Sequence, residues 1–516
     1  MSAVDVIVIG AGANGLTAAA VLAAKGRRVR VLERAERLGG MARNTELAEG
    51  VHGPEMAHLL YNLSPKVAKE LSLKSALKLH ALADVALAED GAHAVFDGDS
   101  VRLAGGAAHP EAEAFLALHR RLCRFAGLLG QLADRTPPEI AGGIAGLSDL
   151  GALGRLGLDL KRMGKAEMRE FLRILLSNVY DLLLEDLGDG PLAGMLAADA
   201  VRGAHMGPRS PGTVFSLMYR LGQGGRAHLP EGGMGAVTEA LAEAARRKGA
   251  DIRTGCAVAA VLTEGDTVRG VRLEDGSEIA ASCVVSSLAA PVSMHLAGVA
   301  NYDIEAARRL RHMRARGNVA KVNLVLGALP EVPGLSRAEM AGRLVVAGSV
   351  TAVERAFNPV KYGEMSEAPV IEAVIPTLTD RSLARDGRHV LSANVQFVPY
   401  DPAGGWTEHL RETLRARVTA RLDAVLPGLS GRVEAAEILT PADIEARIGA
   451  PGGHWHHGEL SLDQLLTVRP VNGLARYRFG PRGYYLCGAS AHPGGDVSGA
   501  AGRNAARQVL KDGGAA

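Results

Sequence analysis

Cysteine is scarce in this chain and never closely paired. The 516 residues contain 4 cysteines, and Cys123, Cys256, Cys283 and Cys487 form no C-x-x-C motif. A redox-active dithiol needs such a motif, and many zinc sites contain one, so neither is predicted and no metal site is expected. The free thiols favour a reducing, cytoplasmic location.

An excess of charge of one sign and long apolar runs are also absent from the sequence. The net charge is +2, from 58 basic and 56 acidic residues, which provides no bulk field that would attract nucleic acid. No apolar run approaches the ~18 residues that a membrane span requires, and Asp5 interrupts the apolar core that a signal peptide would have. A hydrophobic content of 47% instead predicts a folded protein of two or three lobes, with no oligomeric state indicated.

The first 32 residues predict a βαβ unit. An apolar run at 6–9 predicts a buried strand, an Ala-rich stretch at 14–25 predicts a helix, and residues 28–32 resemble the next strand. Phosphates bind at the N-terminus of the helix in such a unit, because unpaired N–H groups and the helix dipole favour anions. Ala13 and Asn14, which open this helix, are therefore expected to bind a dinucleotide.

Three glycines and one acid narrow the choice of nucleotide. Gly10 allows a tight turn, Gly12 lets a pyrophosphate approach the backbone, and Gly15 lets helix and strand pack closely. Glu33 ends the second strand, about 20 residues beyond the turn, where a carboxylate can accept hydrogen bonds from both ribose hydroxyls. A 2′-phosphate would be repelled there, so NADP is disfavoured and NAD and FAD stay open.

A second glycine pair follows the ribose acid. The stretch RAERLGGMAR contains Arg34, Gly39, Gly40 and Met41. It resembles the extension of large flavoproteins in which backbone beside the glycines lies against the FAD pyrophosphate and leads toward the flavin ring. This resemblance favours FAD, because NAD enzymes have no general need for the extension.

The C-terminal region predicts a second cradle for the cofactor. A short apolar strand at 484–487 is followed by a Gly-rich loop and by an Ala-rich helix expected to start near Val497. Gly488, Asp496 and Val497 are expected beside FAD, because a loop at a helix N-terminus can direct N–H groups at the N1–C2=O edge of a reduced flavin. An ordinary strand-loop-helix closure is the alternative.

Several longer motifs resemble a known family nearly end to end. They are the dinucleotide turn, the GG extension, GVHGPEMAHLLYNLSPKV, ADAVRGAHMGPRSPGT, LPEGGMGAVTEALAEAARRKGADI, PGGHWHHGELSLDQLLTVRP and YYLCGASAHPGGDVSGAAGRNAA. The chain resembles the flavoproteins that include carotenoid desaturases, retinol saturase and flavin amine oxidases, and within them the branch named after pyridine nucleotide-disulphide oxidoreductase domain-containing protein 2. Asp496 is a departure, because related chains often continue as HPGGG. Its carboxylate is expected to contact a FAD hydroxyl or a phosphate-bound water, or to cap the next helix.

The resemblance implies an α/β fold with a Rossmann-type, GR2-like FAD-binding domain assembled from discontinuous segments. The segments expected to form this domain are residues 1–80, 226–300 and 446–516. An inserted α+β substrate lobe is expected from residues 81–225 and 301–445. Turn signals between short β-rich runs predict a small antiparallel meander after Val258, at whose position a valine contacts the adenine end of FAD in related flavoproteins.

The resemblance also implies an FAD-dependent oxidoreductase. We expect a dehydrogenase or desaturase that passes a hydride from an organic substrate to flavin N5, with oxygen or another acceptor reoxidising the flavin. A flavin amine oxidase is one alternative, for which Tyr484, Tyr485 and Trp455 are the only obvious suppliers of an aromatic cage in the C-terminal region. A non-catalytic flavoprotein that acts as an interaction partner is the other alternative.

Three side chains are candidates for catalysis. His492 lies in the AHPGG loop, where an imidazole could orient the flavin or exchange a proton, or could simply bond to loop backbone. His457 belongs with His454 and His456 to a cluster that lacks the helical spacing of metal ligands and is expected to line the mouth of the active site. Lys321 resembles the strand lysine that holds a water against flavin N5 in amine oxidases, although a snorkelling surface lysine is the alternative.

The insertion from 111 to 187 predicts long amphipathic helices. Apolar residues at helical spacing are Phe115, Leu116, Leu122, Phe125, Leu129 and Leu132, with Arg120, Arg121 and Arg124 between them. Such a helix could make peripheral contact with a membrane and admit a lipophilic substrate, but a stripe facing the protein core is favoured. Because the insertions show no concentrated set of charged residues, a largely apolar substrate is expected.

Overall fold

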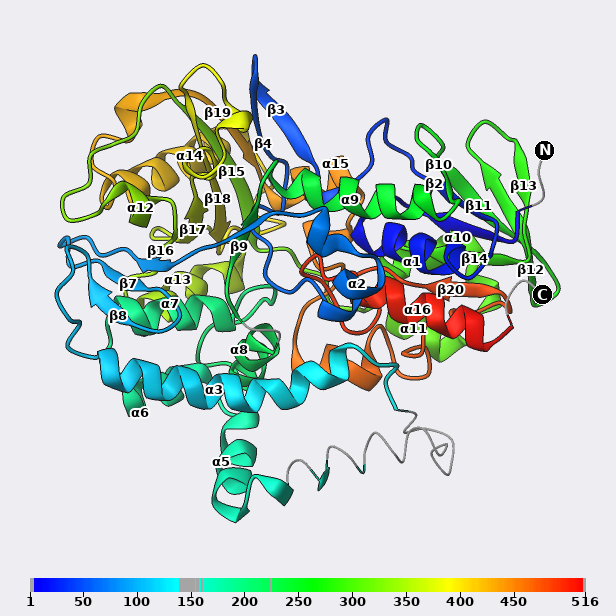
Figure 1. Cartoon of the computed structure of the whole chain (residues 1–516), viewed down its shortest axis with the longest axis horizontal. Helices are drawn as coiled ribbons and strands as arrows, with labels where there is room; N and C mark the ends of the chain where they lie inside the picture. Colours follow the sequence, from blue (N-terminus) through cyan, green and yellow to red (C-terminus); the bar gives the residue numbers. More distant parts are fainter. Residues whose placement is uncertain (1–3, 139–153, 155–156, 159–160, 223–224, 514–516) are drawn as a thin grey trace.

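The computed structural model describes residues 4–138, 154, 157–158, 161–222 and 225–513. These residues form two lobes that lie side by side, with both ends of the chain on the same lobe (Figure 1). One lobe contains a five-stranded parallel sheet, and the other contains an eight-stranded mixed sheet.

The parallel sheet has the strand order β10-β2-β1-β14-β20. Its strands are β1 (Val6–Ile9), β2 (Val29–Leu32), β10 (Asp251–Arg253), β14 (Cys283–Ser286) and β20 (Tyr484–Leu486). The neighbouring helices are α1 (Ala13–Ala23), α2 (Pro65–Glu70), α9 (Met234–Arg247), α10 (Ala290–Ala297), α11 (Ile304–Arg311) and α16 (Ala500–Lys511). Strand β1 is an unbroken apolar run because it lies inside this sheet and is fully buried. The expected Rossmann-type sheet is confirmed.

Residues from three distant parts of the sequence complete this lobe. The antiparallel meander consists of β11 (Val258–Glu264), β12 (Thr267–Leu273) and β13 (Glu278–Ala280), as expected. Helix α1 packs against both α9 and α16, which joins the two ends of the chain. Ala307 and Leu310 of α11 are buried in the same core. The packing therefore extends this lobe beyond residue 300, where the segment expected from the resemblance ends.

The second sheet has the order β19-β15-β18-β17-β16-β6-β7-β8. Its strands are β6 (Asp84–Ala86), β7 (Ala94–Phe96), β8 (Val101–Leu103), β15 (Val319–Leu326), β16 (Arg343–Val346), β17 (Val370–Val374), β18 (His389–Gln396) and β19 (Val433–Leu439). Its helices are α3 (Ala112–Ala133), α5 (Lys165–Leu175), α6 (Val179–Asp186), α7 (Pro191–Ala200), α8 (Thr213–Leu221), α12 (Arg337–Met340), α13 (Val350–Phe357) and α14 (Glu408–Asp423). Where the lobes meet lie β3 (Asn44–Ala48) paired with β4 (Val51–Pro54), β5 (Leu79–Ala81) paired with β9 (His228–Pro230), and α15 (Pro441–Ile448).

The apolar stripe of α3 faces the protein interior. Phe115, Leu122, Phe125 and Leu129 are buried in the core of the second lobe, and Arg120 and Arg124 lie on the exposed flank. The core-facing interpretation of this helix is therefore correct. In the part of the chain that the structure describes, every helix is too short or too polar to cross a bilayer.

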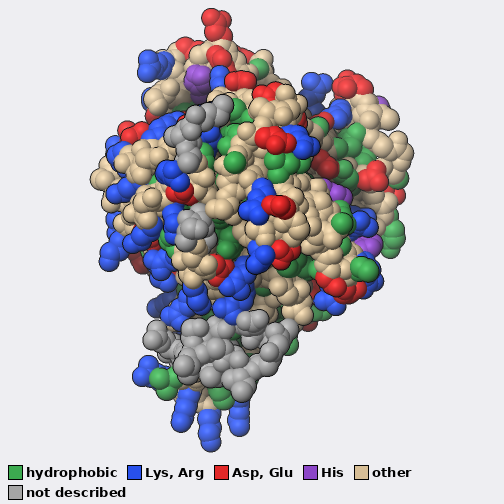
Figure 2. Space-filling view, turned by 90° about the vertical axis from the view of Figure 1, so that its right-hand side faces the viewer, with side chains coloured by type: hydrophobic (Ala, Val, Ile, Leu, Met, Phe, Trp, Pro, Cys, Tyr) green, Lys and Arg blue, Asp and Glu red, His purple; other side chains and the backbone are tan. Residues whose placement is uncertain are grey.

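Charged side chains of both signs cover the surface. On the face shown in Figure 2, Lys and Arg side chains alternate with Asp and Glu over most of the molecule. At the lower end, at the height of α5 in Figure 1, Lys and Arg side chains gather. The sequence over this region includes Lys161, Arg162, Lys165 and Arg169, all of which are exposed.

Candidate active site

A pocket with a volume of about 340 Å³ extends from the glycine-rich turn of the first lobe to side chains of the second lobe. Residues expected beside the cofactor that line it are Gly10, Gly12, Ala13, Asn14, Glu33, Arg34, Gly39, Gly40, Met41, Val258, Asp496 and Val497. His457, proposed as catalytic, lines it as well. Gly15, Gly488, His492 and Lys321 do not.

The start of α1 is open to an anion. Gly12 precedes the helix without a side-chain cap, and the first turn contains no acidic residue, so the N–H groups of this turn remain available. A Cβ atom on Gly12 would meet nothing within 4 Å, whereas one on Gly15 would lie 2.1 Å from the carbonyl oxygen of Gly10. Gly12 therefore leaves space for a ligand, and Gly15 lets the helix pack against the turn.

Glu33 and the GG extension meet at the same turn. The Glu33 carboxylate accepts hydrogen bonds from the N–H groups of Ala11 at 2.7 Å and Ala35 at 3.0 Å. Gly39 forms a parallel bridge with Gly12, and Gly39 and Gly40 both have positive φ, 114° and 54°. The chain folds back over the turn only with such left-handed backbone, which favours glycine.

The C-terminal loop departs from the expectation in two ways. Helix α16 begins at Ala500 with Gly499 as its N-cap, because Asp496 and Val497 have positive φ values of 72° and 54° that no helix tolerates. The expected start near Val497 and the N-cap role of Asp496 are therefore wrong. Gly488 does not line the pocket, and a Cβ there would be 2.3 Å from the Ser287 carbonyl oxygen.

His492 faces a helix and not the pocket. Its Nε2 lies 2.9 Å from the carbonyl oxygen of Leu132 at the end of α3, and the side chain is 1% exposed. The expected role beside the flavin is not supported by this geometry. The alternative, a histidine bonded to backbone, matches what the structure shows, although the backbone belongs to α3.

His457 lies in the pocket wall with a neutral ring. Burial lowers the pKa of His457 to about 4, and its Nδ1 has no hydrogen-bond partner among the described residues. His456 also lines the pocket, while His454 lies behind it and accepts the N–H of His456 at 3.2 Å through Nδ1. The structure places two of the three clustered histidines in the pocket.

Lys321 is buried directly behind the pocket wall. The residue is 1% exposed, and its Nζ lies 3.4 Å from Oδ1 of Asn394, which lines the pocket. Burial lowers the pKa of Lys321 to about 7. The alternative of a snorkelling surface lysine is therefore wrong.

Asn394 connects Lys321 to a histidine in the pocket wall. Its Nδ2 donates to Nε2 of His58 at 2.8 Å, and Nδ1 of His58 donates to the carbonyl oxygen of Ser392 at 3.1 Å. Burial lowers the pKa of His58 to about 4. Nε2 of His58 also lies 3.2 Å from Oε1 of Glu372. The Ser392 carbonyl therefore makes Nδ1 a donor, while burial favours the uncharged ring.

A cluster of buried charges surrounds Tyr61, contrary to the expectation that the insertions lack one. The Tyr61 hydroxyl donates to Glu372 at 2.7 Å, and the guanidinium groups of Arg202 and Arg220 lie 4.3 and 4.1 Å from the ring centre. Glu372 also accepts from Arg343 at 2.8 Å. The charges come from distant sequence positions and compensate one another, so no local run of charge marks them in the sequence.

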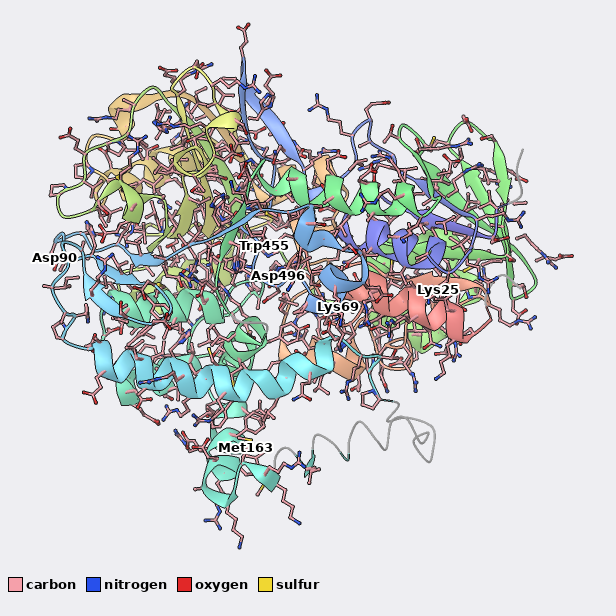
Figure 3. The ribbon with its side chains drawn as sticks, viewed as in Figure 1. Lys25, Lys69, Asp90, Met163, Trp455 and Asp496 are labelled. Atoms are coloured by element: carbon pink, nitrogen blue, oxygen red, sulfur yellow. The ribbon has the colours of Figure 1, made fainter. Side chains whose placement is uncertain are left out.

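The aromatic rings of the pocket are Tyr61 and Trp455. Trp455 and Asp496 lie near the centre of the molecule, where the lobes meet (Figure 3). Tyr484 and Tyr485, the other expected cage residues, are buried in the core of the first lobe. Both residues lie on β20, the edge strand of the parallel sheet, and do not line the pocket, so they do not supply the cage that the amine oxidase alternative needs.

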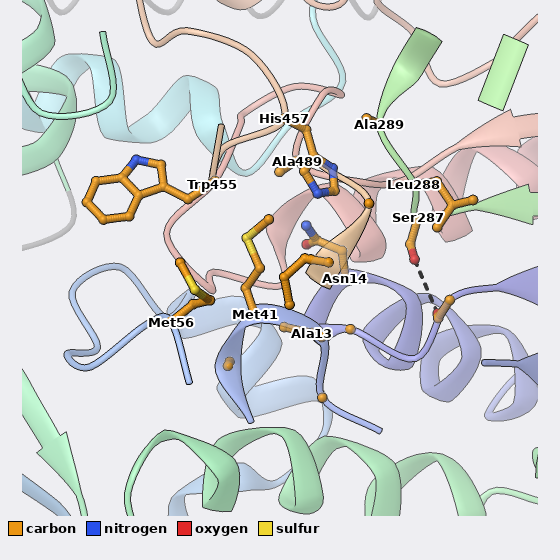
Figure 4. A pocket seen from close by; sticks show the side chains of 18 of the residues that line it. Ala13, Asn14, Met41, Met56, Ser287, Leu288, Ala289, Trp455, His457 and Ala489 are labelled. Atoms are coloured by element: carbon orange, nitrogen blue, oxygen red, sulfur yellow. Dashed lines mark hydrogen bonds between the residues drawn. The ribbon is translucent and has the colours of Figure 1, made fainter. Parts of the chain in front are cut away.

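Several lining residues were not expected from the sequence. They are Met56, His58, Leu59, Tyr61, Arg202 and Asn394. Five of them lie within GVHGPEMAHLLYNLSPKV and ADAVRGAHMGPRSPGT, so the motifs were a signal even though their residues had no assigned role. Figure 4 shows Met41 and Met56 on the side of the pocket toward Trp455, away from Ser287 and Leu288.

The first lobe has a parallel sheet with a glycine-rich turn of the kind that binds dinucleotides, and its pocket continues to the second lobe. This arrangement is that of a two-lobed flavoprotein. Residues 14–510 match the family described as flavin containing amine oxidoreductase. The chain belongs to this family.

Curated relatives cover nearly the whole chain. Pyridine nucleotide-disulfide oxidoreductase domain-containing protein 2 of Rattus norvegicus is 34% identical over 98% of this chain and 93% of that protein. Phytoene dehydrogenase of Streptomyces griseus is 28% identical over 87% of this chain and 84% of its own length. A putrescine oxidase structure has the same fold, with a TM-score of 0.60 at 18% identity over 98% of this chain and 99% of that one.

FAD is the cofactor of this flavin oxidoreductase. The residues present fit it, because the open turn at Gly12 and the uncapped start of α1 suit a pyrophosphate and Glu33 suits a ribose. The described residues include no group of three or more His, Cys, Asp or Glu side chains that could hold a metal ion.

Proposed function

We propose that this protein is an FAD-dependent dehydrogenase or desaturase that acts on an uncharged, largely apolar organic substrate. The lining toward the second lobe supports the proposal, because Met41, Met56, Leu59, Tyr61 and Trp455 offer mainly apolar contact. Such a substrate binds mainly through buried apolar area, at about 25 cal/mol per Å², while a few polar groups fix its orientation. The phytoene dehydrogenase relative is consistent with this chemistry.

The chain's own residues bind the cofactor, exclude water and handle the proton. FAD, when bound, accepts a hydride from a substrate C–H bond. Gly12, Ala13 and Asn14 hold the pyrophosphate at the start of α1, and Glu33 holds a ribose. His457 contributes a neutral imidazole to the pocket wall, so the proton that leaves the substrate passes to this ring or to water.

A flavin amine oxidase is the second candidate function. The buried Lys321 on β15 favours it, because a lysine whose pKa is lowered to about 7 exchanges protons near neutral pH. The putrescine oxidase fold is consistent with it. Against it, the Tyr61 ring already lies against the guanidinium groups of Arg202 and Arg220, which disfavour a second cation at this ring.

Anaerobic reduction of the bound flavin distinguishes these functions. The holoenzyme is mixed with a panel of polyenes and other lipophilic alkenes and alkanes, and separately with primary and secondary amines. The proposal predicts loss of the visible flavin absorbance only with members of the first panel. Rapid reduction by a small charged amine would promote the amine oxidase, with Lys321→Met as the first variant. Bleaching by a strong reductant such as dithionite but by neither panel would favour a non-catalytic flavoprotein.

A further inference from the structure

Asp496 is held in a conformation that side chains rarely adopt. Its φ is 72°, a left-handed value that glycine adopts without strain and aspartate adopts at a cost. The side chain accepts hydrogen bonds from three groups: Nη2 of Arg202 at 2.8 Å, Nε2 of His456 at 3.1 Å and Nδ2 of Asn62 at 3.0 Å. These contacts hold the carboxylate at the pocket wall despite the strain.

The carboxylate of Asp496 is charged. Burial alone would raise its pKa, but Arg202 and the hydrogen bond from His456 hold the pKa of Asp496 well below its ordinary value. His456 stays neutral, because burial lowers its pKa further than Asp496 raises it. The anion is therefore matched by Arg202 and not by the imidazole.

Arg202 brings a permanent cation to the same wall. Its guanidinium lies 4.3 Å from the centre of the Tyr61 ring and 5.8 Å from that of Trp455. Its other ion-pair partner, Glu372, lies 3.3 Å away and is shared with Arg343. Glu372 does not line the pocket, so Asp496 is the charged group that balances Arg202 at the pocket surface.

The remaining charged lining residues lie near the nucleotide end. Glu33 and Arg34 follow β2, and Glu274 follows the meander strand β12. Among the described residues, the charged groups of the lining on the side of Tyr61 and Trp455 are therefore Arg202 and Asp496. With both present, the charges of the lining residues at this end cancel.

We propose that Asp496 determines substrate specificity by neutralising Arg202, so that the end of the pocket beside Tyr61 and Trp455 accepts uncharged groups and rejects carboxylates and ammonium groups. This inference rests on the proposed function, since it concerns the charge of the substrate of that site. An incoming ammonium group meets rings already in contact with a guanidinium. An incoming carboxylate meets a guanidinium already paired with Asp496 and Glu372.

Removal of the Asp496 carboxylate leaves Arg202 with Glu372 alone, which Arg343 and Tyr61 also engage. Arg202 then has a donor free to bind an anion from the pocket, with the flanking rings available to contact an aryl group. The change Asp496→Gly suits this test, because glycine adopts a φ of 72° without strain. Asp496→Asn is a matched second variant, because asparagine tolerates the left-handed region and keeps the size of the side chain.

The experiment is titration of the holoenzymes with benzoate, benzyl alcohol and benzylamine, followed by calorimetry and by the visible flavin spectrum. We expect benzoate to bind both variants about tenfold or more tightly than the wild type, while the affinity for benzyl alcohol changes little and benzylamine gains nothing. Benzoate binding that is unchanged in both variants, or equally tight in the wild type, would overturn the inference. A merely structural role for Asp496 would lower the melting temperature without creating an anion site.

The benzoate titration and the anaerobic flavin reduction test different claims, so the role of Asp496 and the proposed function can fail independently. A wild type that oxidises amines in the anaerobic panel rejects the proposed dehydrogenase, whatever the variants bind. A wild type that is reduced by lipophilic substrates while the variants show no gain for benzoate rejects only the role of Asp496. If Asp496→Gly does not fold, Asp496→Asn decides the question alone.

Discussion

At the residue scale, Glu33 is the side chain expected to bind a ribose of the cofactor. Its carboxylate is held by two backbone N–H groups, those of Ala11 and Ala35, and lines the pocket where a ribose is expected. Glu33→Ala should weaken FAD binding by about 1.5–3 kcal/mol for each charge-assisted hydrogen bond lost, as an upper bound. The measurement is the FAD dissociation constant of the reconstituted protein.

Glu264→Ala is the control for this prediction. Glu264 is exposed at the end of the meander strand β11, so its replacement should leave the FAD dissociation constant unchanged. Equal FAD occupancy in Glu33→Ala and the wild type would mean that the ribose assignment is wrong.

Lys321 should give the stability of the protein a particular dependence on pH. Burial lowers its pKa to about 7 from the ordinary value of 10.5, so the unfolded chain binds this proton more tightly than the folded one. The contribution of Lys321 to the free energy of unfolding therefore rises with pH between these two values and is constant below them. Its largest slope is about 1.4 kcal/mol per pH unit.

Replacement of Lys321 by methionine should remove this dependence. The free energy of unfolding of Lys321→Met relative to the wild type should fall as the pH is raised from about 7 to about 9, because only the wild type gains stability over that interval. Urea unfolding of both proteins at the two pH values measures the difference. Lys69→Met, at an exposed lysine, is the matched control. A difference that does not change with pH for Lys321→Met would show that the lysine is not buried as described.

At the scale of the element, the start of α1 separates cofactor binding from folding. Gly12 has ordinary extended backbone and open space for a Cβ, whereas a Cβ on Gly15 would collide with the Gly10 carbonyl. Gly12→Ala should change the stability of the FAD-free protein by no more than about 1 kcal/mol but abolish FAD retention. Gly15→Ala should destabilise the FAD-free protein itself. Thermal unfolding and FAD content of both variants test this, and equal FAD retention in Gly12→Ala and the wild type would place the pyrophosphate elsewhere.

Elements with one strong local signal could be predicted from the sequence. The βαβ unit followed from an apolar run, a glycine turn and an Ala-rich stretch, and α1 differs from the expected helix only at its ends. The start of α16 was placed three residues too early, because the sequence does not reveal that Asp496 and Val497 adopt positive φ. Such backbone is maintained by contacts made across the fold.

The residues at the substrate end of the site could largely not be predicted, because contacts across the fold bring them together. Tyr61, Arg202 and Asn394 come from a loop, a turn and a strand, and only the three-dimensional structure brings them together at one pocket wall. His492 had a strong motif around it, yet its ring direction depends on the Leu132 carbonyl at the end of α3. Sequence patterns identified the nucleotide end because a cofactor imposes its own spacing on the chain.

At the scale of the whole molecule, the two lobes contribute different residues to the pocket. The first lobe supplies Gly12, Glu33 and the loop at Asp496, while the second supplies Arg202, which contacts Asp496, and Asn394. The cofactor end depends on backbone geometry and the substrate end depends on side chains from several elements. Substitutions at the substrate end should therefore alter specificity with less effect on FAD retention than changes at the turn.

The central claim is that this pocket holds FAD. The most direct test is to purify the protein, release its chromophore by denaturation and identify it by chromatography and mass spectrometry. We predict a yellow protein that releases close to one equivalent of FAD per chain, with neither NADP nor metal in stoichiometric amount. A colourless protein that binds NAD in place of FAD would contradict the account.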